Sequence, residues 1–275
     1  MAFFKTSDGL QLYYEDIGQG TPVLCLAGLT RCTTDFSFVA PHLADYRMIA
    51  MDYRGRGRSD YDESYINYAI PREAQDAIEL LDHLGIDKTA ILGTSRGGLI
   101  AMTLAATAPD RLWAVILNDI GPEIAAPGLE RIWDYVGIEP TAKTLEEAAH
   151  ALQHLSQAQF PDVPFERWLR HTKHLFRQSD DGLRLRYDAR LRDAMIEQGK
   201  SGLAPDLWPI FDALKSIPTG VIRGANSDLL SAETYARMIT RRPEIIAAEV
   251  PDRGHVPFLD EPEAVRVIHQ VLDLA

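Results

Sequence analysis

Short, unbroken runs of apolar residues recur along this chain, and they limit the folds that it can adopt. The first run reads PVLCLA at residues 22–27 and stops at Gly28. A strand that is apolar at every position is typically buried on both faces, as in a parallel sheet, whereas alternation marks a half-exposed strand. Similar runs lie at 46–51, 89–92, 113–117 and 219–222. The pattern therefore predicts a largely parallel sheet with helices on both faces.

Segments with apolar residues at helical spacing separate these runs. They lie at 71–84, 97–108, 231–240 and 262–274. Strands that alternate with helices in this way are typical of an α/β fold. Ahead of them, residues 3–6 and 10–16 flank a Ser-Asp-Gly turn and predict a β-hairpin.

The alternation is interrupted between residues 122 and 207. This part of the chain has no convincing strand, and its charged, helix-like stretches lie at 129–136, 145–155, 165–176 and 187–197. Because the strand pattern resumes afterwards, the segment is expected to be an insert rather than a second domain in series. We expect an α/β core formed by residues 1–121 and 208–275, and a helical cap formed by residues 122–207 that covers one end of the sheet.

The balance of charge narrows the possible partners. Lys and Arg total 28 against 40 Asp and Glu, so the formal net charge is −12 at pH 7. A chain this acidic is repelled by phosphate backbones, which argues against nucleic acid as a partner. It has no basic amphipathic segment and no stretch approaching the ~20 apolar residues needed to span a bilayer, so no membrane role is predicted. A small-molecule substrate is the expected partner.

The N-terminus and the cysteines indicate a reducing compartment. The first residues, MAFFKTSDG, lack the basic region and the long apolar run of a signal peptide. Cys25 and Cys32 match no zinc spacing, and they do not suggest a disulfide framework. The sequence thus predicts a cytoplasmic protein without a bound metal.

The segment with the most chemical information is Gly-Thr-Ser-Arg-Gly at residues 93–97. An apolar strand leads into it and a helix leads out of it, so Ser95 is expected on a sharp turn with a strained backbone. Such a turn exposes the serine hydroxyl at the end of a strand. It also points the N–H of Arg96, at the start of the helix, toward a developing oxyanion. Ser95 is therefore the candidate nucleophile.

A second oxyanion donor is expected from the loop after the first parallel strand. This loop reads Ala-Gly-Leu-Thr at 27–30, where Gly28 allows a close approach and Leu29 supplies the N–H group. Arg31 and Arg96 lie within this loop region and the serine turn, and either guanidinium could pair with a substrate carboxylate. An internal salt bridge or a solvent-facing side chain is the alternative for each arginine.

A serine hydroxyl needs a base to take its proton, and His255 is the best placed of the eight histidines. It lies in the loop DRGHVPF, between the apolar segment 245–250 and the last helix. A loop at the strand-end edge of the sheet can bring an imidazole to Ser95. The other histidines lie in helix-like stretches or beside a proline, where packing or surface roles are expected.

The carboxylate that orients the base has two candidates. Asp228 follows the apolar run at 219–222, and Asp119 follows the run before it. Asp228 is favoured because it lies 27 residues before His255, which leaves room for one helix and one strand, and because its loop is small and polar. Asp119 leads into the cap, where its carboxylate can accept backbone N–H bonds and fix the exit of the chain. The predicted triad is Ser95, Asp228 and His255, with Asp119 as the alternative acid.

Five stretches, in this order, resemble the α/β-hydrolase family from about residue 10 to residue 274. They are the 27–30 loop, DYRGRGRS at 52–59, the serine turn at 93–98, the loop at 224–228 and GHVP at 254–257. The resemblance implies an eight-stranded, mostly parallel sheet with a helical cap, a Ser–acid–His triad and no cofactor. The 52–59 stretch is expected to brace loops rather than to bind substrate. Arg96 departs from the family, which usually has an apolar or amide residue after the nucleophile, and Ala27 stands where many members have His.

More narrowly, the chain resembles small bacterial serine esterases and ring-breakdown hydrolases. We expect a serine hydrolase that cleaves a small ester, or a related acyl bond, through an acyl-enzyme on Ser95. The same triad would also serve a carbon–carbon bond or amide hydrolase of a ring-breakdown pathway. A ligand receptor with a vestigial triad is an alternative from another class. A dehalogenase is disfavoured, because halide displacement needs a carboxylate nucleophile where this chain has a serine.

Overall fold

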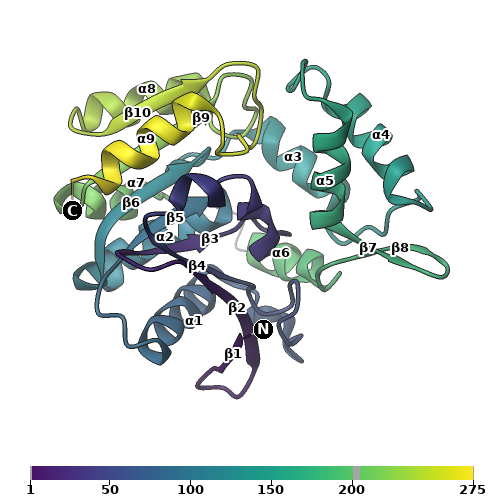
Figure 1. The fold of residues 1–275 in the computed structure, drawn as a ribbon, viewed down its shortest axis with the longest axis horizontal. Coiled ribbons are helices and arrows are strands. Elements are labelled where there is room, and N and C mark those ends of the chain that lie inside the picture. Colours follow the sequence, from purple (N-terminus) through teal and green to yellow (C-terminus); the bar gives the residue numbers. More distant parts are fainter. Residues whose placement is uncertain (1, 201–204, 275) are drawn as a thin grey trace.

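An eight-stranded sheet forms the centre of the molecule (Figure 1). The computed structural model describes residues 2–200 and 205–274, so residues 1, 201–204 and 275 of the predicted domains lie outside the description. The strands follow the order β1-β2-β4-β3-β5-β6-β9-β10. β2 pairs antiparallel with β1 and β4, and every other pair in the sheet is parallel. The predicted α/β fold with an eight-stranded, mostly parallel sheet is confirmed.

The strands coincide closely with the predicted runs. They are β1 (Ala2–Lys5), β2 (Gln11–Ile17), β3 (Pro22–Leu26), β4 (Arg47–Met51), β5 (Thr89–Thr94), β6 (Leu112–Asn118), β9 (Thr219–Gly224) and β10 (Ile246–Val250). β5 and β6 run past their last branched apolar residues to end at Thr94 and Asn118. These extra residues bring Ser95 and Asp119 directly to the edge of the sheet.

Both faces of the parallel strands are buried, which explains their unbroken apolar runs. In β3, Leu24 and Leu26 contribute to the core on one face, and Val23 and Cys25 to the core on the other. Burying one such side chain stabilises the fold by about 1.5–3 kcal/mol. The first core also contains residues of α1 (Ile70–His83), α2 (Arg96–Thr107) and α8 (Ala232–Arg241), and the second contains residues of α9 (Pro262–Leu272). None of the described helices is long and apolar enough to cross a bilayer.

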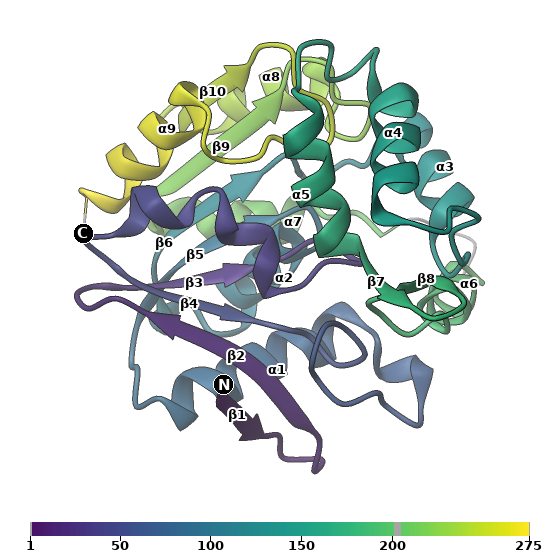
Figure 2. The ribbon, with the colours of Figure 1, turned by 45° about the vertical axis from the view of Figure 1, so that its right-hand side comes forward.

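Between β6 and β9 the chain forms mainly helices. These elements are α3 (Ala126–Tyr135), α4 (Leu145–Ser156), α5 (Phe165–Leu175), β7 (Phe176–Ser179), β8 (Gly182–Leu185), α6 (Leu191–Gly199) and α7 (Trp208–Asp212). Figures 1 and 2 show α3, α4 and α5 grouped to one side of the sheet, whereas α7 lies by α2 in the core. The hairpin β7–β8 is not expected from the sequence. Its four-residue strands are too short to show a clear period of two.

The close approach of α2 to the sheet depends on the glycines of the serine turn. A Cβ atom at Gly97 would overlap the main-chain carbonyl oxygen of Leu26, at the end of β3. A Cβ atom at Gly98 would overlap the side chain of Ile120. Larger residues would therefore push the start of α2, and with it Ser95, away from β3.

Gly97→Ala should lower the free energy of unfolding by about 2–3 kcal/mol or more, because its methyl group meets main chain that cannot rotate away. Gly199→Ala is the matched control. Gly199 ends α6, and a methyl group added there would meet no atom of the described residues within 4 Å, so an alanine should be neutral or stabilise by less than about 1 kcal/mol. Urea unfolding of both variants tests this, and equal stabilities would contradict it.

Candidate active site

Ser95 lies at the turn between β5 and α2, and its backbone is strained. Its φ of 51° and ψ of −113° are unusual for a residue with a side chain. The surrounding hydrogen bonds hold this conformation, because the Ser95 N–H donates to the carbonyl of Asn118 at 2.9 Å and the N–H of Gly98 donates to the Ser95 carbonyl at 2.9 Å. The predicted strand–turn–helix context of Ser95 is thus present in the structure.

His255 bridges the serine and a carboxylate. Its Nε2 lies 3.0 Å from the Ser95 Oγ, and its Nδ1 lies 2.7 Å from an oxygen of Asp119. A neutral imidazole with its proton on Nδ1 donates to that carboxylate and leaves Nε2 free to accept the serine proton. The three side chains therefore have the arrangement of a nucleophile, a base and an orienting acid.

Asp119 is fully buried, and its carboxylate is surrounded by donors. One oxygen accepts the N–H of Gly224 at 2.8 Å, and the other accepts the hydroxyl of Ser227 at 2.6 Å as well as the bond from His255. Several donors from different directions fix the orientation of the carboxylate against the imidazole. The backbone of Asp119 also turns sharply, with a φ of 55°.

The prediction that Asp228 orients His255 is wrong, because the carboxylate at the imidazole is that of Asp119. Asp228 instead forms an ion pair with Arg131 of α3 at 2.9 Å. The small polar loop after β9 does turn inward, but it contributes donors rather than the acid, through Gly224 and Ser227. The backbone role expected for Asp119 is also present, since its carboxylate accepts the Gly224 N–H while it holds the imidazole.

Both predicted oxyanion donors belong to segments beside the serine. α2 begins at Arg96, so the N–H of this residue has no carbonyl of an earlier turn to bind. In the loop after β3, a Cβ atom at Gly28 would lie 3.9 Å from the Ser95 Cβ and 3.4 Å from the Arg31 Cγ. The Leu29 carbonyl accepts a bond from the Arg56 Nε at 3.1 Å, which fixes the orientation of this loop.

The Arg31 side chain contacts α5, whereas the Arg96 side chain points into the core. The Nη1 of Arg31 lies 3.0 Å from the Nε2 of His171 on α5 and 3.8 Å from a carboxylate oxygen of Asp35. The Arg96 guanidinium forms an ion pair with Glu73 at 2.6 Å. The internal salt bridge considered from the sequence is therefore the arrangement at Arg96.

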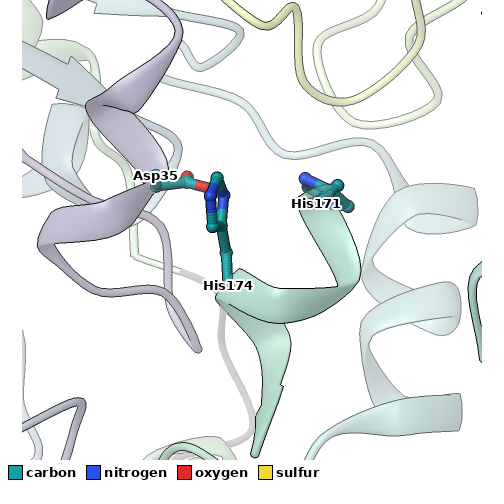
Figure 3. Close-up of side chains that lie close together, drawn as sticks. All are labelled: Asp35, His171 and His174. Atoms are coloured by element: carbon teal, nitrogen blue, oxygen red, sulfur yellow. The ribbon is translucent and has the colours of Figure 1, made fainter. Parts of the chain in front are cut away.

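Asp35, His171 and His174 form a cluster whose possible ligand atoms all lie within 4.8 Å of one another (Figure 3). No local pattern in the sequence predicts it, because Asp35 is far along the chain from the α5 histidines. Burial, helped by the nearby Arg31, lowers the pKa of His171 well below its ordinary value, and burial lowers the pKa of His174 to about 4. The cluster has ligands that suit a divalent cation, but the Arg31 guanidinium already contacts His171 and stands next to Asp35, so a metal would meet a fixed positive charge.

A family model described as the alpha/beta hydrolase fold matches residues 21–262. With the strand order and the serine turn described above, this match shows that the chain belongs to the α/β-hydrolase fold family. We therefore place it among the hydrolases of that family.

This chain matches individual relatives over most of its length. It is 37% identical over 257 residues to the 3-hydroxybutyrate-oligomer hydrolase of Cupriavidus necator, covering 90% of this chain and 87% of the relative. It is 27% identical to the 2-(acetamidomethylene)succinate hydrolase of Mesorhizobium japonicum, and the match covers 90% of this chain and 85% of the relative. The crystal structure of an alpha/beta hydrolase from Novosphingobium aromaticivorans has a TM-score of 0.92 and 40% identity, covering 100% of this chain and 98% of that one.

Asp119→Asn should lower kcat by roughly 10⁴-fold in a protein that still folds, because an amide at this position favours the wrong tautomer of His255. Asp228→Asn is the matched control and should keep most of the activity, since Asp228 contacts Arg131 rather than the imidazole. Both can be measured with p-nitrophenyl acetate. An inactive, folded Asp228→Asn beside a nearly normal Asp119→Asn would refute the assignment.

Proposed function

We propose that this protein hydrolyses a small carboxylic ester through an acyl-enzyme on Ser95. The observation that carries the proposal is the continuous hydrogen-bonded line from Ser95 through His255 to the buried Asp119, at 3.0 and 2.7 Å. The oligomer hydrolase relative supports an ester, because units of a hydroxy acid are joined by ester bonds. The intact triad argues against a ligand receptor that has lost its catalytic groups.

In the acylation step, the Oγ of Ser95 attacks the ester carbonyl carbon while Nε2 of His255 takes the hydroxyl proton. The carbonyl oxygen becomes an oxyanion, which the N–H groups of Leu29 and Arg96 bind. When the intermediate collapses, the C–O bond to the alcohol breaks and His255 returns the proton to the leaving oxygen. Asp119 stabilises the imidazolium between these transfers.

Deacylation repeats the sequence with water as the nucleophile. His255 takes a proton from the water as it attacks the acyl carbon, and it then protonates the departing Oγ of Ser95. The products are a carboxylic acid and an alcohol, and the enzyme returns to its starting state. The chain's own side chains carry every proton and the acyl group in this scheme, which calls for no cofactor.

We further propose that residues 122–207 act as a cap over the serine. This proposal is supported by a contact between the segment and the loop that contains His255. Phe258, three residues after His255, packs against Phe160, Trp168 and His171. An apolar cover of this kind limits the access of water and shapes the substrate site. An amide substrate is the second candidate, favoured by the name of the Mesorhizobium japonicum relative, whose identity to this chain is lower.

The substrate that we propose carries a carboxylate, which Arg31 binds. Arg31 follows Gly28, where an added Cβ atom would come within 3.9 Å of the Ser95 Cβ, and the Arg31 side chain is 22% exposed. Its Nη1 contacts a histidine whose pKa burial holds low, and a carboxylate at 3.8 Å. No side chain or carbonyl in the described part of the chain accepts a hydrogen bond from its Nε or Nη2. These donors are suited to a carboxylate, such as the acid end of a hydroxy-acid oligomer.

Ser95→Ala should lower turnover by roughly 10⁴-fold or more while the protein stays folded, because the acyl group loses its attachment point. A serine-directed organophosphate should label Ser95 in the unmodified protein, as peptide mass mapping can establish. Labelling at another residue, or full activity in the alanine variant, would refute the mechanism.

If Arg31 binds a substrate carboxylate, monomethyl succinate should exceed dimethyl succinate in kcat/KM by about tenfold or more. Arg31→Leu should remove this preference but keep activity on the diester. Arg184→Leu is the control, because Arg184 lies on the β8 hairpin and pairs only loosely with Asp181, at 3.8 Å. A preference for the diester in the unmodified protein, or a preference for the half-ester that survives Arg31→Leu, would refute the role of Arg31.

A further inference from the structure

A buried carboxylate between two arginines lies behind the serine turn. Glu73, on α1, is fully buried, and its two oxygens contact Arg56 Nη1 at 2.8 Å and Arg96 Nε at 2.6 Å. Arg56 is also fully buried, between the rings of Tyr53 and Tyr68. Burial alone would raise the pKa of Glu73, but the two guanidinium groups outweigh it and hold the pKa below its usual value. The carboxylate therefore stays ionised.

One arginine holds the loop that contains Leu29. The Nε of Arg56 donates to the Leu29 carbonyl at 3.1 Å, and its Nη1 donates to the carbonyl of Arg54 at 2.7 Å. The hydroxyl of Tyr53 supports the same loop by donating to the Ala27 carbonyl at 3.0 Å. Residues of the 52–59 stretch thus hold the 27–30 loop through its carbonyl groups. Glu73 in turn fixes the Arg56 guanidinium that bonds to Leu29.

The other arginine belongs to the serine turn itself. Arg96 follows Ser95 and is the first residue of α2, and its Nη2 donates to the carbonyl of Tyr68 at 3.1 Å. Its guanidinium reaches away from the reacting hydroxyl toward Glu73. The same carboxylate therefore joins the loop after β3 to the start of α2, which come from distant parts of the chain.

We propose that Glu73 is a positioning residue that sets the spacing between the two oxyanion donors, the N–H groups of Leu29 and Arg96. This inference rests on the proposed acyl-enzyme mechanism. An oxyanion hole works only when both donors lie about 2.7–3.1 Å from the oxyanion, and displacements of about 1 Å cost about 10²-fold in rate. A rigid link through one ionised carboxylate meets this requirement better than two independent loops would.

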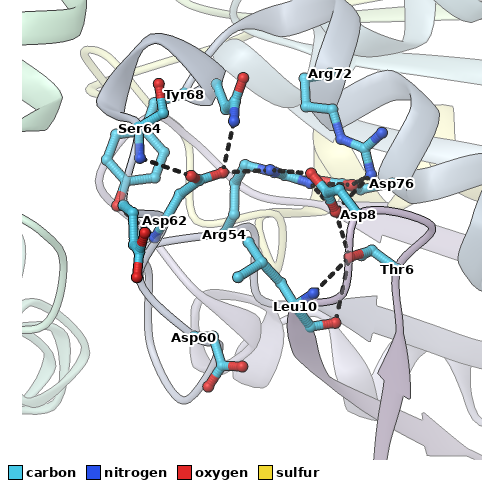
Figure 4. Close-up of polar contacts among 12 residues, drawn as sticks. Thr6, Asp8, Leu10, Arg54, Asp60, Asp62, Ser64, Tyr68, Arg72 and Asp76 are labelled. Carbon is cyan, nitrogen blue, oxygen red and sulfur yellow. Dashed lines mark hydrogen bonds and ion pairs between the residues drawn. The ribbon is translucent and has the colours of Figure 1, made fainter.

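A neighbouring ion cluster on the same helix offers a matched control. Asp76, also buried on α1, pairs with Arg54 through two bonds of 2.7 Å, within a network that includes Asp8, Asp62 and Arg72 (Figure 4). Within the described residues, the Arg54 side chain bonds to these acids and not to the 27–30 loop or the serine turn, and only its main-chain carbonyl meets the Glu73 link, by accepting the Arg56 Nη1 bond. In Asp76→Asn the Arg54 side chain keeps Asp8 and Asp62 as partners, and both ion pairs of Glu73 remain. This variant should therefore test the loss of a buried charge while the two oxyanion donors stay in place.

The test compares Glu73→Gln with Asp76→Asn, using p-nitrophenyl acetate for turnover and a trifluoromethyl ketone as an analogue of the tetrahedral intermediate. Glu73→Gln should lower kcat by about 10- to 100-fold, weaken binding of the analogue by a similar factor and leave KM within about threefold. The pH midpoint of kcat/KM should stay unchanged, because the triad is intact. Asp76→Asn should lose stability but keep kcat and analogue affinity within about threefold.

Arg56→Lys covers the case in which Glu73→Gln does not fold. It keeps a positive charge beside Glu73 but removes the Nε donor to Leu29, so kcat and analogue affinity should fall together in the same way. Unchanged kcat in a folded Glu73→Gln, or equal losses of kcat in the Glu73 and Asp76 variants, would overturn the inference. Ser95→Ala, assayed in parallel, separates this failure from failure of the proposed mechanism, because only the latter leaves Ser95→Ala active.

Discussion

The pairing of β5 with β6 is the constraint on which the candidate site depends. Thr94 and Asn118, the last residues of these parallel strands, lie opposite each other in the sheet. The residues that follow them, Ser95 and Asp119, therefore leave the sheet at the same edge, and the Ser95 N–H binds the Asn118 carbonyl. The His255 imidazole can therefore contact both side chains from a single position at this edge. The placement of Ser95 and Asp119 is in this sense a consequence of strand register, because each directly follows the end of a strand. His255 comes from the loop after β10.

This dependence on register explains why some site residues could be predicted and others could not. Ser95 has a local signature, since the glycines around it and the change from strand to helix are all visible in one short stretch. The choice between Asp119 and Asp228 has no such signature, because both follow apolar runs. It is decided by the neighbour relation of the strands: β6 adjoins β5, whereas β9 lies one strand further away. Asp228 also stands four residues beyond the end of β9, outside the turn that faces the imidazole.

Charged residues with long-range partners are the hardest to anticipate. Glu73 lies in a segment whose helical pattern is evident, and an acid in the first turn of a helix is ordinary on a surface. Its burial is made possible by two arginines from other parts of the chain, and one of them is Arg96, the unusual residue after Ser95. In the sequence, the unusual arginine at position 96 is the one sign that a buried acid partner is needed. The contact of Arg31 with His171 similarly joins residues that no local pattern relates.

The position at which the helical segment enters and leaves the sheet has an evolutionary consequence. The chain departs after β6 and returns at β9, and these two strands are hydrogen-bonded neighbours whose register runs from Val115 with Thr219 to Asn118 with Ile222. The ends of the segment are thus held together by the sheet whatever its length, and each doubling of an insert's length costs only about 0.6 kcal/mol in closure entropy. Because Asp119 directly follows β6, ahead of the first helix of this segment, successive generations could exchange or enlarge the segment without moving the candidate catalytic groups.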